Sequence, residues 1–133
     1  MTRRRLLSLL AGAFALGCDH GDAPAEPVWG KEPCAHCAMI LSDRRFGAQL
    51  ATPGGDRFFF DDPGCLVSFL EERKLASYRA WVHDAQTGAW LDASNARYAR
   101  AASPMDFGFE ARAAGDVSWN EMRASVLAKR GAR

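Results

Sequence analysis

The amino-terminal quarter of the 133-residue chain is set apart by composition, and it leaves only about 100 residues to form a fold. Residues 6–16 are an apolar run of 11 residues that follows a basic start. Such a run is too short to span about 30 Å of hydrocarbon, which needs about 20 residues, but it is typical of a secretory signal. Residues 19–33 hold three prolines and few apolar residues. They predict an extended, flexible tether.

The apolar run ends at Gly17-Cys18, and this arrangement resembles a bacterial lipobox. Lipidation would make Cys18 the first residue of the mature protein; ordinary signal cleavage, leaving a free thiol, is the alternative. The three arginines before the run fit a twin-arginine export signal as well as an ordinary basic start. We therefore expect a signal peptide over residues 1–17, a lipidated tether over 18–33 and one domain over 34–133. The protein is then anchored to a membrane outside the cytoplasm.

The charge of the mature chain argues against one broad class of function. Without Arg3, Arg4 and Arg5, 14 basic residues stand against 16 acidic ones. A nearly neutral chain is not a general nucleic-acid binder. The sequence also contains no G-x-S-x-G motif and no glycine-rich phosphate loop. We therefore expect no nucleic-acid partner and no hydrolytic or phosphate-transfer site.

The first half of the domain predicts a hairpin followed by a helix. Residues 46–52 and 57–60 flank a Pro-Gly-Gly-Asp turn and predict a β-hairpin. Asp62-Pro63 is typical of a helix start, and apolar residues at helical spacing predict a helix over residues 63–74. Strands are expected next, at 78–83 and 89–92.

The second half repeats this order. Strands are expected at residues 96–102 and 107–113, and Ser118 with Glu121 forms a capping box before a helix. Neither half buries a core alone, so we predict an α+β fold of two small hairpin-plus-helix units packed together. The chain stops about one turn past the second helix, so the second unit is expected to lack a last strand.

The chemistry concentrates in Cys34-Ala35-His36-Cys37-Ala38-Met39, which carries four sulfur or imidazole side chains in six residues. A redox dithiol is one hypothesis, but thioredoxin-type pairs follow a strand and begin a helix. Neither element is evident here. A structural zinc site is a second, but zinc commonly takes two Cys-x-x-Cys knuckles and the second is missing.

A monovalent copper site is the third hypothesis, because thiolate and thioether ligands select Cu(I). Cys37 and Met39 are two residues apart, so an extended segment points both side chains to one side. Met105 lies in a polar loop where an apolar residue has no obvious core role, and it is a candidate third donor.

Each of these residues also has a plainer interpretation. His36 fits an exposed loop histidine and Met105 a residue folded back on the core. Cys34 is a ligand, half of a disulfide with Cys37, or idle. Cys65 in the first helical turn is better explained as a buried small hydrophobe, and His83 as a structural hydrogen-bond partner.

The sequence resembles the NosL family, which are lipoproteins that serve nitrous-oxide reductase maturation. The resemblance covers about residues 34–112, most of the mature chain. The pieces that carry it are, in order, the lipobox-like Cys18, Cys34-Ala35-His36-Cys37-Ala38-Met39-Ile40, Arg57-Phe58-Phe59-Phe60-Asp61-Asp62-Pro63-Gly64-Cys65-Leu66, Trp81-Val82-His83-Asp84, Trp90-Leu91-Asp92-Ala93, and Tyr98 with Met105-Asp106-Phe107-Gly108-Phe109. Ala38 departs from the family, which usually has Gly before Met.

The resemblance implies two related ββαβ units and a Cu(I) chaperone that is not an enzyme. Its implied partners are nitrous-oxide reductase, whose copper-sulfide centre receives the copper, and a membrane ABC-type maturation complex. By motif match the ligands are Cys37, Met39 and Met105, with His36 and Cys34 as further candidates. The alternatives are copper delivery to another exported enzyme, a thiol–disulfide oxidoreductase using Cys34 and Cys37, and a structural lipoprotein with a zinc or disulfide staple.

Overall fold

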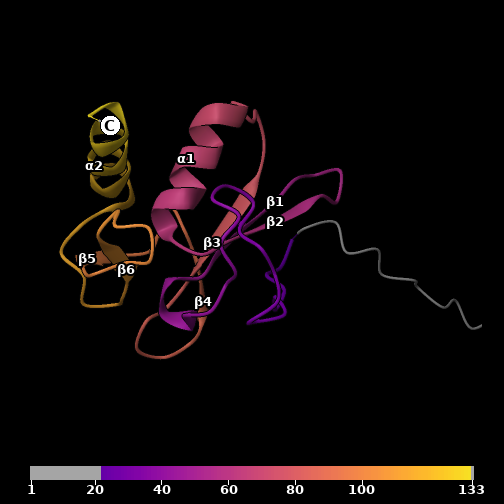
Figure 1. The fold of residues 1–133 in the computed structure, drawn as a ribbon, viewed down its shortest axis with the longest axis horizontal. Helices are drawn as coiled ribbons and strands as arrows, with labels where there is room; N and C mark the ends of the chain where they lie inside the picture. Colours follow the sequence, from indigo (N-terminus) through magenta and orange to yellow (C-terminus); the bar gives the residue numbers. More distant parts are fainter. Residues whose placement is uncertain (1–21, 133) are drawn as a thin grey trace, which may run out of the picture.

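The computed structural model describes residues 22–132 and shows the predicted α+β architecture, with two antiparallel sheets and two helices (Figure 1). The larger sheet has the strand order β2-β1-β3-β4, and the smaller sheet pairs β5 with β6. The elements are η1 (Arg44–Phe46), β1 (Ala48–Ala51), β2 (Arg57–Phe60), α1 (Pro63–Arg73), β3 (Arg79–His83), β4 (Trp90–Asp92), β5 (Tyr98–Arg100), β6 (Phe109–Ala111) and α2 (Trp119–Gly131).

The two hairpin-plus-helix units are both present. β1 and β2 form a hairpin before α1, and β5 and β6 form one before α2. No strand follows α2 within the described residues. The predicted signal peptide and Cys18 lie outside the described part of the chain. Within that part, neither helix has the length and hydropathy needed to cross a membrane.

Both helix starts follow their sequence signals. Asp62 caps α1, where its Oδ1 accepts a hydrogen bond of 2.7 Å from the Gly64 N–H, and Pro63 takes the first helical position. Ser118 and Glu121 form the predicted capping box of α2. α1 packs on β1 and β2 and also against α2, so the two units share one core.

The predicted tether is shorter than expected, because its described part is docked on the larger sheet. The Gln49 side chain of the central strand β1 is fully buried, and its amide exchanges two 2.9 Å hydrogen bonds with the backbone of Ala25. Arg57 donates to the Ala23 carbonyl, and Trp90 donates to Glu26. A buried amide needs partners, and an extended proline-rich segment has free backbone groups to supply them. The packed part of the chain therefore starts by Ala23, not near Cys34.

The approach of the second unit to α1 requires a glycine at position 64. A Cβ atom on Gly64 would overlap the ring of the buried Phe107, which lies in the loop between β5 and β6. We expect Gly64→Ala to lower the unfolding free energy by about 1–3 kcal/mol, as overpacking does. Urea denaturation followed by tryptophan fluorescence measures the effect. Gly54→Ala is the matched control, since its Cβ would meet nothing closer than 3.9 Å; equal midpoints for the two variants would contradict the close approach.

Candidate metal centre

Two neighbouring cysteines, Cys34 and Cys37, meet the distant Cys65 in the structure. Cys34 and Cys37 come from the loop before η1, and Cys65 lies in the first turn of α1. The three sulfur atoms all lie within 4.8 Å of one another. All three are free thiols; Cys34 and Cys65 are buried, and Cys37 is half-buried. This cluster is able to hold a metal ion.

The cysteine loop, residues 34–39, is a tight turn closed by its own backbone. The Cys34 N–H donates to the Met39 carbonyl over 2.7 Å, and the Ala38 N–H donates to the Cys34 carbonyl over 3.0 Å. Ala38 has a φ of 65°, in the left-handed region that glycine adopts without a steric cost. An alanine at this position therefore carries a conformational cost that a glycine would not.

The loop is docked on the free edge of the larger sheet. β2 is an edge strand, and its Phe59 carbonyl accepts a 2.8 Å hydrogen bond from the Ala35 N–H. An edge strand presents unpaired backbone groups that need covering. This contact brings Cys34 beside the end of β2, and so beside α1, which begins three residues after that strand.

The charge is unevenly distributed over the three sulfurs. A hydrogen bond from the Cys65 thiol lowers the pKa of Cys34 to about 5 and outweighs the opposing effect of burial. Backbone N–H groups add to this effect, among them the N–H of Cys37 at 3.5 Å from the Cys34 sulfur. Donating that hydrogen bond, together with burial, raises the pKa of Cys65. Burial raises the pKa of Cys37. At neutral pH the apo centre therefore holds one thiolate, Cys34, and two thiols.

Two acids adjoin the cluster at the start of α1. Asp62 is fully buried; its Oδ2 accepts a 3.0 Å hydrogen bond from the Met105 N–H, while its other oxygen caps the helix. Asp61 is 4% exposed, and its Oδ1 has no hydrogen-bond partner among the described residues. Burial, and then the nearby Cys34 thiolate, raise the pKa of Asp61 to about 6.

The two methionines predicted as copper ligands come from different segments, Met39 from the cysteine loop and Met105 from the loop between β5 and β6. Met39 is 57% exposed, two residues after Cys37. Met105 is half-buried, and the contact of its N–H with Asp62 ties its loop to the start of α1, three residues before Cys65. The role of both thioethers as ligands stays a prediction.

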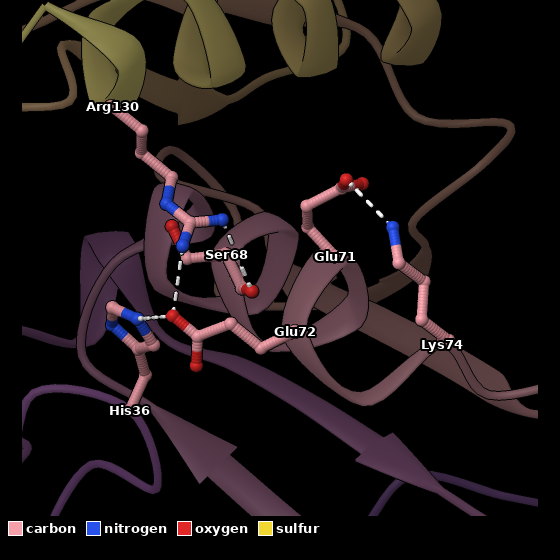
Figure 2. Close-up of polar contacts among 6 residues, drawn as sticks. All are labelled: His36, Ser68, Glu71, Glu72, Lys74 and Arg130. Carbon is pink, nitrogen blue, oxygen red and sulfur yellow. Dashed lines mark hydrogen bonds and ion pairs between the residues drawn. The ribbon is translucent and has the colours of Figure 1, made fainter.

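The two histidines among the described residues, His36 and His83, lie outside the group of three sulfurs. His36 directs its Nε2 to the Oε1 of Glu72 at 3.2 Å (Figure 2). His83 is 7% exposed and packs edge-on against two indoles, with ring centroids 5.7 Å from Trp29 and 4.9 Å from Trp90.

Cys65 is the residue that sequence reasoning undervalued. The Asp62-Pro63 signal correctly placed it in a first helical turn, but its periodicity matched that of a core residue. Its contact with Cys34 depends on the loop docking at Phe59, 24 positions further along the chain from Ala35. Such a contact leaves no local sequence signal.

Searches of known protein families, of curated proteins and of solved structures find no match for this chain.

The lowered pKa of Cys34 predicts a thiolate that persists in mild acid. In metal-free, reduced residues 19–133, we expect one of three thiols to titrate with a midpoint near pH 5, measured as thiolate absorbance in the ultraviolet. Cys34→Ser is expected to remove this step and leave two thiols whose pKa values burial keeps above the ordinary thiol value. A wild-type titration with no step below pH 7 would contradict the assignment.

The raised pKa of Asp61 predicts a pH-dependent stability. The folded protein holds this proton more tightly than the unfolded chain does. The resulting stabilisation is complete below the unfolded pKa of about 3.9 and is lost as the pH rises through about 6. Between pH 4 and pH 7 wild type should therefore lose about 1–3 kcal/mol of unfolding free energy that Asp61→Asn does not lose. The stability of the variant relative to wild type should rise by that amount over the same range. Urea denaturation at several pH values measures this gain. The exposed turn residue Asp56, changed to Asn, is the control and should show no such trend.

Proposed function

We propose that the three-cysteine centre binds Cu(I) and that the protein is a copper chaperone, which passes the ion to an acceptor protein. The observation that carries the proposal is the mutual approach of Cys34, Cys37 and Cys65 within 4.8 Å. Metal–thiolate bonds are about 2.3 Å long, so three sulfurs around one ion lie about 4 Å apart. Only small side-chain movements separate the apo arrangement from that geometry.

The donor set favours Cu(I) over other ions. Thiolates select soft monovalent copper, whereas structural zinc is almost always held by four ligands. Of the Cys, His, Asp and Glu side chains that the structure describes, the group brings together three, and all three are cysteines. A three-sulfur site suits an ion that accepts low coordination.

The uneven exposure of the donors supports transfer rather than permanent storage. Cys34 and Cys65 are buried, Cys37 is half-buried, and Met39 is mostly exposed beside them. In the proposed exchange, Cys37 and the weak thioether donor Met39 meet the incoming ligands first. The ion then passes through a shared intermediate, while the buried sulfurs release it last.

The docked amino-terminal segment supports a membrane-anchored orientation. Asp22 lines a surface hollow together with Pro53 and Tyr78, at the hairpin-turn end of the larger sheet. The cysteine loop is attached near the other end of β2, where Phe60 leads to α1. A lipid on Cys18, four residues before Asp22, would therefore leave the metal centre directed away from the membrane.

From the resemblance of the sequence to the NosL family, we propose that the acceptor of the copper is nitrous-oxide reductase and that an ABC-type membrane complex takes part in the delivery.

Anaerobic titration of reduced residues 19–133 with Cu(I), against a chromophoric chelator, tests the proposal. We expect one Cu(I) per chain and a fall in affinity of at least tenfold for Cys37→Ala and for Cys65→Ala. The second loss would be specific to a three-sulfur site. Met39→Leu and Met105→Leu test the thioethers, with the buried core residue Met122→Leu as the matched control. Absence of competitive Cu(I) binding would end the chaperone proposal.

A thiol–disulfide oxidoreductase is the second candidate, and the lowered pKa of Cys34 favours it. Against it, the Cys34 sulfur is buried and the loop turns back on itself instead of starting a helix. This alternative predicts disulfide reductase activity in metal-free protein, lost in Cys34→Ser. Tight Cu(I) binding that depends on Cys65, without such activity, would exclude it.

A further inference from the structure

We propose that Glu72 is a positioning residue of the metal centre: it holds the cysteine loop on α1 through His36, and Arg130 of α2 holds Glu72. The inference rests on the proposed copper-binding function, because it assigns a role toward that site. It arises from a contact network that sequence reasoning did not predict (Figure 2).

His36 is the link between the loop and the helix. It lies between Cys34 and Cys37, so a constraint on its side chain is a constraint on both sulfurs. Its Nε2 donates to the Glu72 carboxylate over 3.2 Å, and its side chain is only 21% exposed. Among the described residues, its buried Nδ1 has no hydrogen-bond partner. The bond to Glu72 therefore determines the ring's orientation.

Besides its backbone contact with Phe59 of β2, the loop has two attachment points on one face of α1. Cys65 and Glu72 are seven residues apart, which is close to two helical turns, so their side chains lie on one face about 10 Å apart. The loop contacts this face at the sulfur of Cys65 and again, through His36, at Glu72. Contact at one point would let the loop pivot, whereas contact at two points fixes its orientation relative to Cys65.

Arg130 extends the network to the second unit. Its Nη2 donates to the same Glu72 oxygen over 2.8 Å, and its Nη1 donates to the Ser68 carbonyl over 3.5 Å (Figure 2). Arg130 in the last turn of α2 thereby holds the Glu72 carboxylate in place, and that carboxylate holds the cysteine loop through His36. The Glu72 side chain is 49% exposed, and ion pairs this accessible contribute little to global stability. The consequence of the network is expected in the loop, not in the unfolding midpoint.

The neighbouring acid supplies a matched control. Glu71 pairs with Lys74 over 2.8 Å and points away from the cysteine loop (Figure 2). It has the same charge, lies on the same helix turn and has its own cationic partner. Its removal reproduces the general cost of losing a surface carboxylate without touching His36.

The experiment compares Glu72→Ala, Glu72→Gln and Glu71→Ala in residues 19–133, which contain every packed residue that the structure describes. Three quantities are measured: Cu(I) affinity by chelator competition, amide hydrogen exchange of residues 34–40 in the metal-free protein, and the thermal midpoint. Loss of an outer-shell partner typically weakens metal binding 10- to 100-fold. Because His36 is not itself placed among the sulfurs, we expect about a 3- to 10-fold loss for Glu72→Ala, with loop exchange accelerated by a similar factor.

Glu72→Gln keeps an acceptor oxygen for His36 and should retain most of the affinity, and Glu71→Ala should match wild type. Arg130→Ala should change the loop in the same direction as Glu72→Ala. The proposal is overturned if Glu72→Ala and Glu71→Ala behave alike, or if exchange rises evenly over the chain with a lowered midpoint. If wild type binds no Cu(I), the proposed function fails, and the exchange measurement alone decides the positioning role.

Discussion

The carboxylate of Asp62 is the contact on which the arrangement of the centre depends. One oxygen caps α1 and the other accepts the Met105 N–H, so a single buried side chain starts the first helix and holds the loop of the second unit. Burial raises the pKa of Asp62, but both of its oxygens are hydrogen-bonded, which offsets the cost of burying a carboxylate. Cys65 owes its position to this cap, because the first turn of α1 begins there.

The candidate metal centre is built from two segments that are held by different contacts. Cys65 is placed by the helix cap, and Cys34 and Cys37 are placed by a loop whose backbone pairs with the edge of β2. Each segment has hydrogen-bond partners of its own within the protein. A geometry held in this way would lower the ordering cost of binding a ligand at the centre.

The proline-rich segment shows how a tether becomes part of a fold. Its few apolar residues do not build a core, but its unpaired backbone groups satisfy the buried amide of Gln49. Trp29 also packs against His83, and the carboxylate of Glu26 accepts hydrogen bonds from the indole N–H groups of Trp29 and Trp90. The segment therefore packs against the larger sheet, and it runs from the hairpin-turn end of that sheet to the cysteine loop.

Local chemistry was enough to predict the secondary structure and the chemical character of the site. The caps at Asp62 and Ser118, the Pro-Gly-Gly-Asp turn and the density of sulfur near Cys37 all act within a few residues, so they can be recognised in the sequence. The tertiary structure alone decided that Cys65 joins Cys34, that Glu72 and Arg130 hold His36, and that the tether packs from Ala23 onward. Each of these contacts joins residues 24 or more positions apart. Pairing over such separations depends on how sheets, helices and loops pack, and no local pattern encodes it.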